Sequence, residues 1–396
     1  MATYKEQNKL NVPHLRFPEF EGEWEKCKLG DIATGFDYGM NAPAKVFDGV
    51  NKYIRITDID EASSTYNDSD IVSPDGTLTD TYLVNERDIL LARTGASTGK
   101  SYLYKKTDGK LYFAGFLIRA NVPEHNPYFV FSQLHTHRYW KWVSIMSARS
   151  GQPGINSQEY SSFPIYTTSI QEERKISKLL SLLEERIATQ SKLIEDLKKL
   201  KSAIIEIEYT PNTKTTSHIG NVIEQISKRN KNNAIQNVLS VSNRQGFIKQ
   251  SDQFENRNVA SEDTSNYKIV EKNDFAFNPA RINVGSIARL TTFENGIVSP
   301  MYICFRTQEN VAPEYIDFFF ESKHFYCEIQ KRLEGSVRQC LSFEGLCNIP
   351  FSLPTLEMQQ RIGKRLFTLG QKIKTETDLL ELLNKQKQYL LRQMFI

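Results

Sequence analysis

Two segments of the chain carry apolar residues at alternating spacings of four and three, the pattern of a coiled-coil seam. The first seam runs through Ile176, Leu180, Leu183, Ile187, Gln190, Ile194, Leu197, Lys201 and Ile204. A shift of 186 residues gives the second, through Ile362, Leu366, Leu369, Ile373, Glu376, Leu380, Leu383, Lys387 and Leu390. Because the two seams match at their polar positions as well, we predict that they pair within the chain. The alternatives are burial against an adjacent domain and a homodimer zipper.

Local signals bound the first of these helices. Ser169 followed by Glu172 resembles a capping box at its start, and Pro211 lies just beyond its end. A helix over about residues 170–207 would be about 55 Å long at 1.5 Å per residue.

The polar positions of the seams predict a register. If the helices run antiparallel, the midpoint of one seam lies opposite the midpoint of the other, which places Gln190 against Glu376. A polar pair inside a seam can fix register at some cost in stability. We therefore predict that these two residues set the register of the helix pair.

The globular segments before each helix repeat as well. Under the same shift, "NERDILLAR" aligns with "EKNDFAFNP", which places Asp88 over Asp274, and Pro164 falls on Pro350. Short runs rich in Tyr, Ile and Phe alternate with Gly, Asn and Asp turns, which is typical of mixed β structure with some helix.

The pattern predicts an α+β protein. Two mixed α/β domains lie in tandem repeat, separated by two long helices that pair as an antiparallel coiled coil. The expected parts are an N-terminal segment (1–17), a first domain (18–168), a central helix (169–209), a second domain (210–353) and a C-terminal helix (354–396).

Composition narrows the class of protein. The net charge of +3 over 396 residues excludes a polybasic tail but not a local basic face for DNA. Five scattered cysteines without a CxxC pair indicate reduced thiols and a cytoplasmic protein. The first residues lack the apolar core of a signal peptide, and no apolar run approaches the roughly 18 residues that span a membrane.

Four segments carry a family resemblance. They are "HLRFPEFEGEWEKCKLGDI", "DILLARTGASTGK", "SGQPGINSQEYSSFPIYTTSIQEERKI" and "EGSVRQCLSFEGLCNIPFSLPTLEMQQRI". In this order and duplication they resemble a Type I restriction–modification specificity subunit, similar to those of Gram-positive bacteria. The resemblance covers essentially the whole chain. The second domain departs from it by lacking an RTGxxxGK phrase, which suits a family whose two domains read different half-sites.

The resemblance implies a function. Each globular domain would be a target-recognition domain docking in the major groove of double-stranded DNA, so that the chain reads a bipartite, asymmetric site. The paired helices would act as a spacer and as the platform for two methyltransferase (modification) subunits, joined by two restriction (motor–nuclease) subunits. The chain itself would be non-catalytic and bind no cofactor, while its partners use S-adenosylmethionine, ATP and Mg²⁺. The alternative is a coiled-coil adaptor with two protein-binding domains.

The stretch "RTGASTGKS" suggests a phosphate-binding loop, but its spacing is wrong. A Walker loop has four residues between its first glycine and the Gly-Lys pair, whereas three separate Gly95 from Gly99. The following "SYLYKKTDG" alternates like a strand, and the repeat aligns Lys100 with Ser286. We conclude that this is not a P-loop.

The same stretch suits DNA contact. An arginine can make a bidentate contact to guanine or to a phosphate, hydroxyls reach phosphate oxygens, and asparagine suits adenine edges. The candidates in the first domain are Arg93, Thr94, Ser97, Thr98 and Lys100, and those in the aligned "NPARINVGS" are Asn278, Arg281 and Asn283. The alternative is a solvated turn with ordinary surface charges.

Three further stretches are weaker candidates for DNA contact. They supply Arg149 and Gln152, their counterparts Arg338 and Gln339, and the turn residues Asn243, Arg244 and Gln245.

Other polar residues have structural explanations. Asn156 with Glu159 is expected to cap a short helix. His135 and His137 have no third ligand nearby, so a helix surface is expected rather than a metal site. No nucleophilic, nuclease or methyltransferase motif is recognisable in the sequence.

Overall fold

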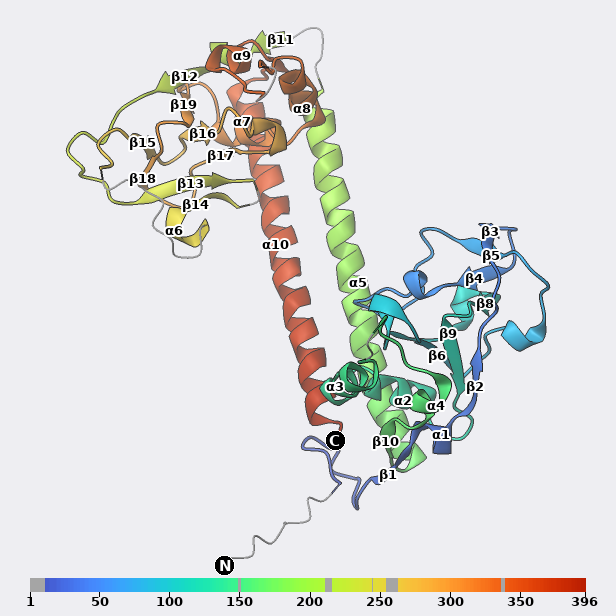
Figure 1. The fold of residues 1–396 in the computed structure, drawn as a ribbon. Helices are drawn as coiled ribbons and strands as arrows, with labels where there is room; N and C mark the ends of the chain where they lie inside the picture. The colour runs from blue at the N-terminus through green and yellow to red at the C-terminus, as the bar shows by residue number, and fades with distance from the viewer. Residues whose placement is uncertain (1–10, 149–150, 211–215, 244, 254–262, 336–338) are drawn as a thin grey trace, which may run out of the picture. The chain divides into compact units, whose positions relative to one another are not determined.

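The computed structural model of the chain describes residues 11–148, 151–210, 216–243, 245–253, 263–335 and 339–396. The chain divides into two units (Figure 1). Unit 1 consists of Met1–Thr189 with Leu379–Ile396, and unit 2 consists of Gln190–Asp378. The long helices α5 (Ile170–Tyr209) and α10 (Leu356–Gln393) each contribute to both units.

Unit 1 is a mixed α/β domain. Its strands are β1 (Glu25–Lys28), β2 (Thr34–Tyr38), β3 (Ala44–Val46), β4 (Lys52–Ile54), β5 (Val72–Pro74), β6 (Asp88–Ala92), β7 (Ser101–Leu103), β8 (Leu111–Phe113), β9 (Leu117–Asn121) and β10 (Pro164–Thr167). Its helices before α5 are α1 (Leu29–Ile32), α2 (Pro127–Gln133), α3 (His137–Met146) and α4 (Ser157–Ser161). The main sheet has the antiparallel order β2-β9-β6-β7, and β1 pairs with β10, β3 with β5 and β4 with β8.

Strand β6 is buried along its whole length because both faces of its sheet are covered. Ile89 and Leu91 point to one face and pack in the cluster that contains α2 and α3. Leu90 and Ala92 point to the other face and pack with β4 and β8. Successive side chains of a strand point to opposite faces, and both faces are buried here. This explains why Ile89 to Ala92 are all apolar.

Unit 2 repeats this plan. Its strands are β11 (Thr216–His218), β12 (Ile223–Ile226), β13 (Val238–Ser242), β14 (Gly246–Lys249), β15 (Lys268–Glu271), β16 (Phe275–Phe277), β17 (Ile287–Arg289), β18 (Asn295–Val298), β19 (Ile303–Thr307) and β20 (Pro350–Ser352). Its helices before α10 are α6 (Gln250–Gln253), α7 (Pro313–Phe319), α8 (Lys323–Gln330) and α9 (Phe343–Cys347). One sheet has the order β12-β19-β16-β17, the counterpart of β2-β9-β6-β7, and a second has the order β14-β13-β18-β15.

The internal repeat extends to single hydrogen bonds. The Asp88 carboxylate accepts a hydrogen bond from the Asn85 amide, and the Asp274 carboxylate accepts one from the Glu271 amide, both at 2.7 Å. Burial raises the pKa of both carboxyl groups. Each aspartate therefore closes the turn that leads into the central strand of its domain, β6 or β16.

The long helices pair antiparallel, as the seams predict. In unit 2, the Gln190 amide donates to the Glu376 backbone oxygen at 3.0 Å and to its carboxylate at 2.5 Å. In unit 1, Lys387 near the end of α10 forms an ion pair with Glu184 in the first half of α5. Both polar seam residues, Gln190 and Glu376, are largely buried. Their contact is observed, and their role in register stays a prediction.

Apolar seam residues form the interior of each helix pair. In unit 1, Leu180 and Leu183 cluster with Leu383 and Leu390. In unit 2, the cluster contains Ile204, Ile205, Tyr209, Ile362 and Leu366. Burial of these side chains is the main favourable term for the pairing.

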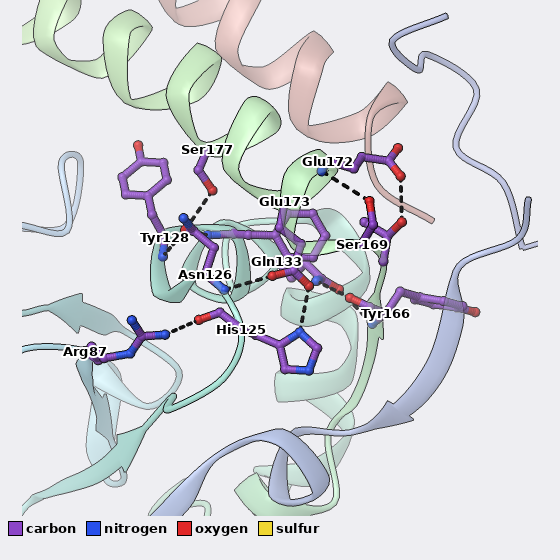
Figure 2. Close-up of polar contacts among 12 residues, drawn as sticks. Arg87, His125, Asn126, Tyr128, Gln133, Tyr166, Ser169, Glu172, Glu173 and Ser177 are labelled. Atoms are coloured by element: carbon purple, nitrogen blue, oxygen red, sulfur yellow. Dashed lines mark hydrogen bonds and ion pairs between the residues drawn. The ribbon is translucent and has the colours of Figure 1, made fainter. Parts of the chain in front are cut away.

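Buried carboxylates anchor the start of α5 to unit 1 (Figure 2). One Glu173 oxygen lies 2.8 Å from Nδ1 of His125, and the other accepts a hydrogen bond from the Asn126 amide at 2.8 Å. The pKa of His125 is raised, chiefly by its hydrogen bond to Glu173. In unit 2, the Gln359 side chain accepts the equivalent bond from the Ala312 amide at 2.9 Å.

The capping box expected at Ser169 is only half formed. The Ser169 hydroxyl accepts a hydrogen bond from the Glu172 amide at 3.3 Å, as expected (Figure 2). The Glu172 carboxylate instead accepts from the Thr168 hydroxyl and from the Arg16 guanidinium. Arg16 outcompetes the backbone because a buried carboxylate gains more from a charged, bidentate donor.

Candidate nucleic-acid interface

Strand β6 ends at a loop that contains the first group of predicted DNA contacts. We call residues 93–100 the Arg93 loop. It contains the single 3-10 turn Gly95–Ser97 and leads directly into strand β7. A Walker loop would open an α-helix here, whose amide groups would face a phosphate. The strand is therefore inconsistent with a P-loop.

The hydroxyl groups of two buried tyrosines form hydrogen bonds with the backbone of the Arg93 loop and of the residue before it. The Tyr160 hydroxyl donates to the Ala92 carbonyl at 2.6 Å and accepts from the Gly99 amide at 3.1 Å. The Tyr139 hydroxyl donates to the Gly99 carbonyl at 2.8 Å. Gly99 has φ of +93°, and a Cβ there would lie 2.7 Å from Val143, so only glycine fits. The backbone on both sides of the turn Gly95–Ser97 is therefore fixed by buried hydrogen bonds.

Three segments of the chain meet at Arg93: the Arg93 loop itself, the turn that contains Phe116 and the stretch that leads to Ile155. The Arg93 amide donates to the Phe116 carbonyl at 3.0 Å, and the Arg93 carbonyl accepts from the Ile155 amide at 2.9 Å. The Gly95 amide donates to the Pro153 carbonyl at 2.9 Å. The "SGQPGIN" stretch, with the exposed Gln152, therefore lies beside the Arg93 loop.

The Arg93 side chain is half-buried and stacked. Its guanidinium lies 4.7 Å from the ring centre of Tyr38, and Nη1 donates to the Gly115 carbonyl at 3.3 Å. The Tyr38 hydroxyl accepts from the Ser157 amide at 3.2 Å; hydrogen bonding to Ser157 lowers its pKa, and the charge of Arg93 lowers it further. Among the residues that the structure describes, Arg93 makes no ion pair with a carboxylate. Its remaining N–H groups are available to a ligand.

Two other candidates of the same loop, Thr98 and Lys100, already have side-chain partners. The Thr98 hydroxyl is largely buried and donates to the Gly95 carbonyl at 2.8 Å. The Lys100 ammonium lies 3.3 Å from the Glu61 carboxylate. Thr94 bridges to Gly154 through its backbone, and the Ser97 carbonyl accepts from the Lys100 amide. For these four residues, DNA contact stays a prediction.

The second group of candidates lies at the equivalent place in unit 2, in residues 278–286, the Asn278 loop. The Pro279 carbonyl accepts from the Leu341 amide at 3.0 Å, the counterpart of the bond between Ile155 and Arg93. The exposed Gln339 is therefore near this loop. Arg281 is exposed, whereas Asn278 and Asn283 are half-buried.

A hairpin turn adds to this second cluster. Asn243 and Gln245 are exposed at the turn between β13 and β14, and a Cβ on Gly285 would lie 3.9 Å from the Asn243 carbonyl. Asn278 and Arg281 line a hollow of about 420 Å³. The structure thus groups the described candidates of unit 2 on one edge of that unit.

Three predicted contacts, Arg149, Arg244 and Arg338, lie outside the described residues. Each belongs to a segment whose described neighbours lie near one of the two loops, namely Gln152, Asn243 and Gln339.

The structure confirms the expected helix cap at Asn156 but contradicts the expected position of His135. Asn156 and Glu159 form a reciprocal capping box at α4, as expected. His137 is exposed at the start of α3, but His135 lies between α2 and α3, with its ring nitrogens 2.9 Å from the Phe131 carbonyl and from the Ser64 hydroxyl. Burial lowers the pKa of His135 to about 4. The expectation of a helix-surface histidine was therefore wrong for His135, because the loop that carries Ser64 covers it.

Sequence reasoning missed the aromatic and apolar residues beside the two loops. Tyr38 stacks on Arg93, Phe116 is 58% exposed beside it, and Met301 is 59% exposed beside Asn278 and Arg281. An apolar residue in a β-rich segment is normally predicted to be core, so only the folded arrangement identifies these as surface residues.

The described part of the chain was searched for metal sites and for membrane-spanning helices. There, no group of three or more His, Cys, Asp or Glu residues is arranged to hold a metal ion. Equally, none of the described helices is long and apolar enough to cross a membrane.

Comparison with known proteins reveals one consistent family. The model of the "Type I restriction modification DNA specificity domain" matches residues 21–199 and again residues 204–385. The chain is similar to the Type I restriction enzyme MjaVIII specificity subunit of Methanocaldococcus jannaschii, with 23% identity over 426 residues that cover 98% of this chain and 94% of the relative.

Solved structures share the fold. The Type I restriction–modification S subunit from M. genitalium has a TM-score of 0.64 and 15% identity, covering 97% of this chain and 99% of its own. A chain from a structural study of complex assembly and conformational transition of the type I R-M system has a TM-score of 0.51 and 14% identity, covering 94% and 97%. These likenesses support the tandem α/β fold with its long helices.

Proposed function

Because this chain belongs to the Type I restriction modification DNA specificity family, we propose that it is the DNA-reading subunit of a Type I restriction–modification complex. The observation that carries the proposal is the duplication. The family model matches the chain twice, and the fold repeats down to the bonds Ile155–Arg93 and Leu341–Pro279. Two copies of one reader suit a target with two halves.

In this proposal each domain reads one half of a bipartite DNA site. The first recognition domain spans residues 18–168 and the second spans 210–353, with helices 169–209 and 354–396 as the spacer. Both loops offer an arginine, but Arg93 lies beside aromatic rings, whereas Arg281 of the Asn278 loop lies among amide and hydroxyl side chains. Because the two loops differ chemically, the two half-sites differ in sequence.

The chemistry belongs to partner subunits in the cytoplasm. Methyltransferase subunits using S-adenosylmethionine would modify adenines at the site, and restriction subunits using ATP and Mg²⁺ would cleave unmodified DNA. We propose two copies of each partner around one copy of this chain. The repeat within the chain supports this number, because a duplicated surface offers two equivalent docking sites.

Salt dependence of binding separates this proposal from an adaptor with two protein-binding domains. The full chain, in complex with its methyltransferase subunits, should bind duplex DNA with an affinity that falls steeply with salt. The expected slope is roughly 0.9 logarithmic units per neutralised phosphate for each tenfold rise in salt. Binding that is equally weak for all duplexes and insensitive to salt would favour the adaptor.

A further inference from the structure

A hollow of about 600 Å³ opens beside Arg93 in unit 1. Most of its wall consists of aromatic rings, small aliphatic side chains and glycine backbone, contributed by Tyr38, Met40, Tyr53 and Phe116 among others. Tyr53 is buried, and its hydroxyl is held by the Met40 carbonyl at 2.7 Å. The hollow is therefore a mainly apolar space. Two guanidinium groups line it, and of these Arg55 is already paired with Asp58 whereas Arg93 is not paired with a described carboxylate.

Phe116 exposes 58% of its surface at this hollow. A single exposed apolar side chain is ordinary on a protein surface. Here, however, the turn before β9 and the equivalent turn before β19 both expose a large apolar side chain, Phe116 in one and Met301 in the other. Phe116 lies beside the Arg93 loop, which follows β6, and Met301 lies beside the Asn278 loop, which follows β16. The repetition indicates that an exposed apolar side chain at this turn belongs to the plan that both domains share.

The chemistry of DNA narrows that role. Among the base-edge features that the major groove presents for direct readout, the C5-methyl of thymine is the apolar one, and apolar side chains recognise it. We propose that the hollow of unit 1 receives the C5-methyl group of a thymine, with Phe116 packed against the methyl and Arg93 bonded to an acceptor on a neighbouring base or phosphate. This inference rests on the proposed DNA-reading function and names one base feature that the first domain reads.

Unit 2 provides an internal contrast. Its hollow is smaller, about 420 Å³, and several hydroxyl and amide side chains line it, including Ser240, Ser286, Ser299 and Gln250. Ser240 and Ser286 are nearly fully buried. A wall of this kind suits hydrogen-bonded base edges, so we expect the strongest dependence on a thymine methyl in the half-site that unit 1 reads.

Replacing thymine by deoxyuridine tests the proposal, because it removes the methyl and leaves the hydrogen-bonding edge unchanged. The full chain in complex with its methyltransferase subunits is titrated with its mapped target duplex, in which one thymine at a time is replaced. At one position the wild-type complex should lose roughly 3- to 10-fold in affinity, about the effect of leaving one methyl unburied.

The Phe116→Ala variant should bind the thymine duplex more weakly and show no further loss with deoxyuridine at that position. Val46→Ala is the matched control, since Val46 is an 89% exposed apolar residue of the same unit outside the hollow. This control variant should keep the wild-type ratio between the affinities for the thymine duplex and the deoxyuridine duplex. An unchanged ratio in Phe116→Ala, or no methyl-sensitive thymine in either half-site, overturns the inference. A wild-type complex that does not distinguish its target from a scrambled duplex overturns the proposed function itself.

Discussion

Arg93 is held differently from the other cation of its loop. Its guanidinium rests on the Tyr38 ring and uses one N–H group on the Gly115 carbonyl. Lys100, seven residues later, has its ammonium 3.3 Å from Glu61 and only 19% of its side chain exposed. A stacked guanidinium keeps its fork of donors in a fixed plane, which suits bidentate contact to a base. We therefore propose that Arg93, rather than Lys100, contacts a base.

Replacing Arg93 tests this assignment. Arg93→Ala should cost roughly 1–3 kcal/mol of binding free energy and relax the sequence preference at one position of one half-site. The measurement is affinity for a panel of target duplexes, each with one base pair changed. Lys100→Ala, the control, should cost less and leave every preference unchanged. A uniform loss across the panel for Arg93→Ala would place its guanidinium on a phosphate instead.

Residue-scale prediction from sequence succeeded where spacing constrains the backbone. The three residues between Gly95 and Gly99 sufficed to reject a P-loop, and strand β7 follows as expected. Sequence could not show that the Thr98 hydroxyl closes its own turn, or that Glu61 pairs with Lys100, because those contacts depend on the folded arrangement. For the same reason the exposure of Phe116 was not predictable.

At the scale of elements, periodicity was the strongest signal. The 4-3 spacing of the seams predicted both long helices, which end within a few residues of the expected bounds as α5 and α10. The short strands were predictable only as a class, since their pairing joins residues far apart in sequence, such as β2 with β9. The local alternation indicates which face a strand buries, but it does not specify which distant strand is its partner.

The polar contact inside the helix pair makes a prediction of its own. Replacing Gln190 and Glu376 together by Leu should raise the free energy of unfolding, because two buried polar side chains become apolar, but should loosen the register. Cysteines introduced by Glu184→Cys and Lys387→Cys report the native register by crosslinking, since these residues form an ion pair. A further variant, Ser191→Cys in place of Glu184→Cys, reports a slip of one heptad.

The double Leu variant should lower the native crosslink and produce the slipped one. Retention of the native crosslink alone, at the wild-type yield, would show that the apolar seam and the attached domains set the register without Gln190 and Glu376.

At the scale of the whole molecule, helix length should set the distance between half-sites. Inserting four residues near residue 200 of α5, with a matched insertion in α10, adds slightly more than one helical turn, or about 6 Å. That is at most about two base pairs at about 3.4 Å each. The unread spacer of the target should lengthen, while both half-sites stay the same.

Insertion into α5 alone is the control for this experiment, because it mismatches the seams and should abolish activity rather than change the spacer. Mapping of methylated sites reads out both variants. An unchanged spacer in a matched-insertion variant that remains active would contradict a spacer role for the helices.

The central claim is that this chain gives a methyltransferase its sequence preference, and a methylome tests it most directly. The chain is co-expressed with its methyltransferase subunit in a host without such systems, and modified adenines are sequenced against a control lacking the chain. The account predicts a split motif of two defined halves, present only with the chain. A soluble, co-purifying complex that leaves no new methylation would contradict it.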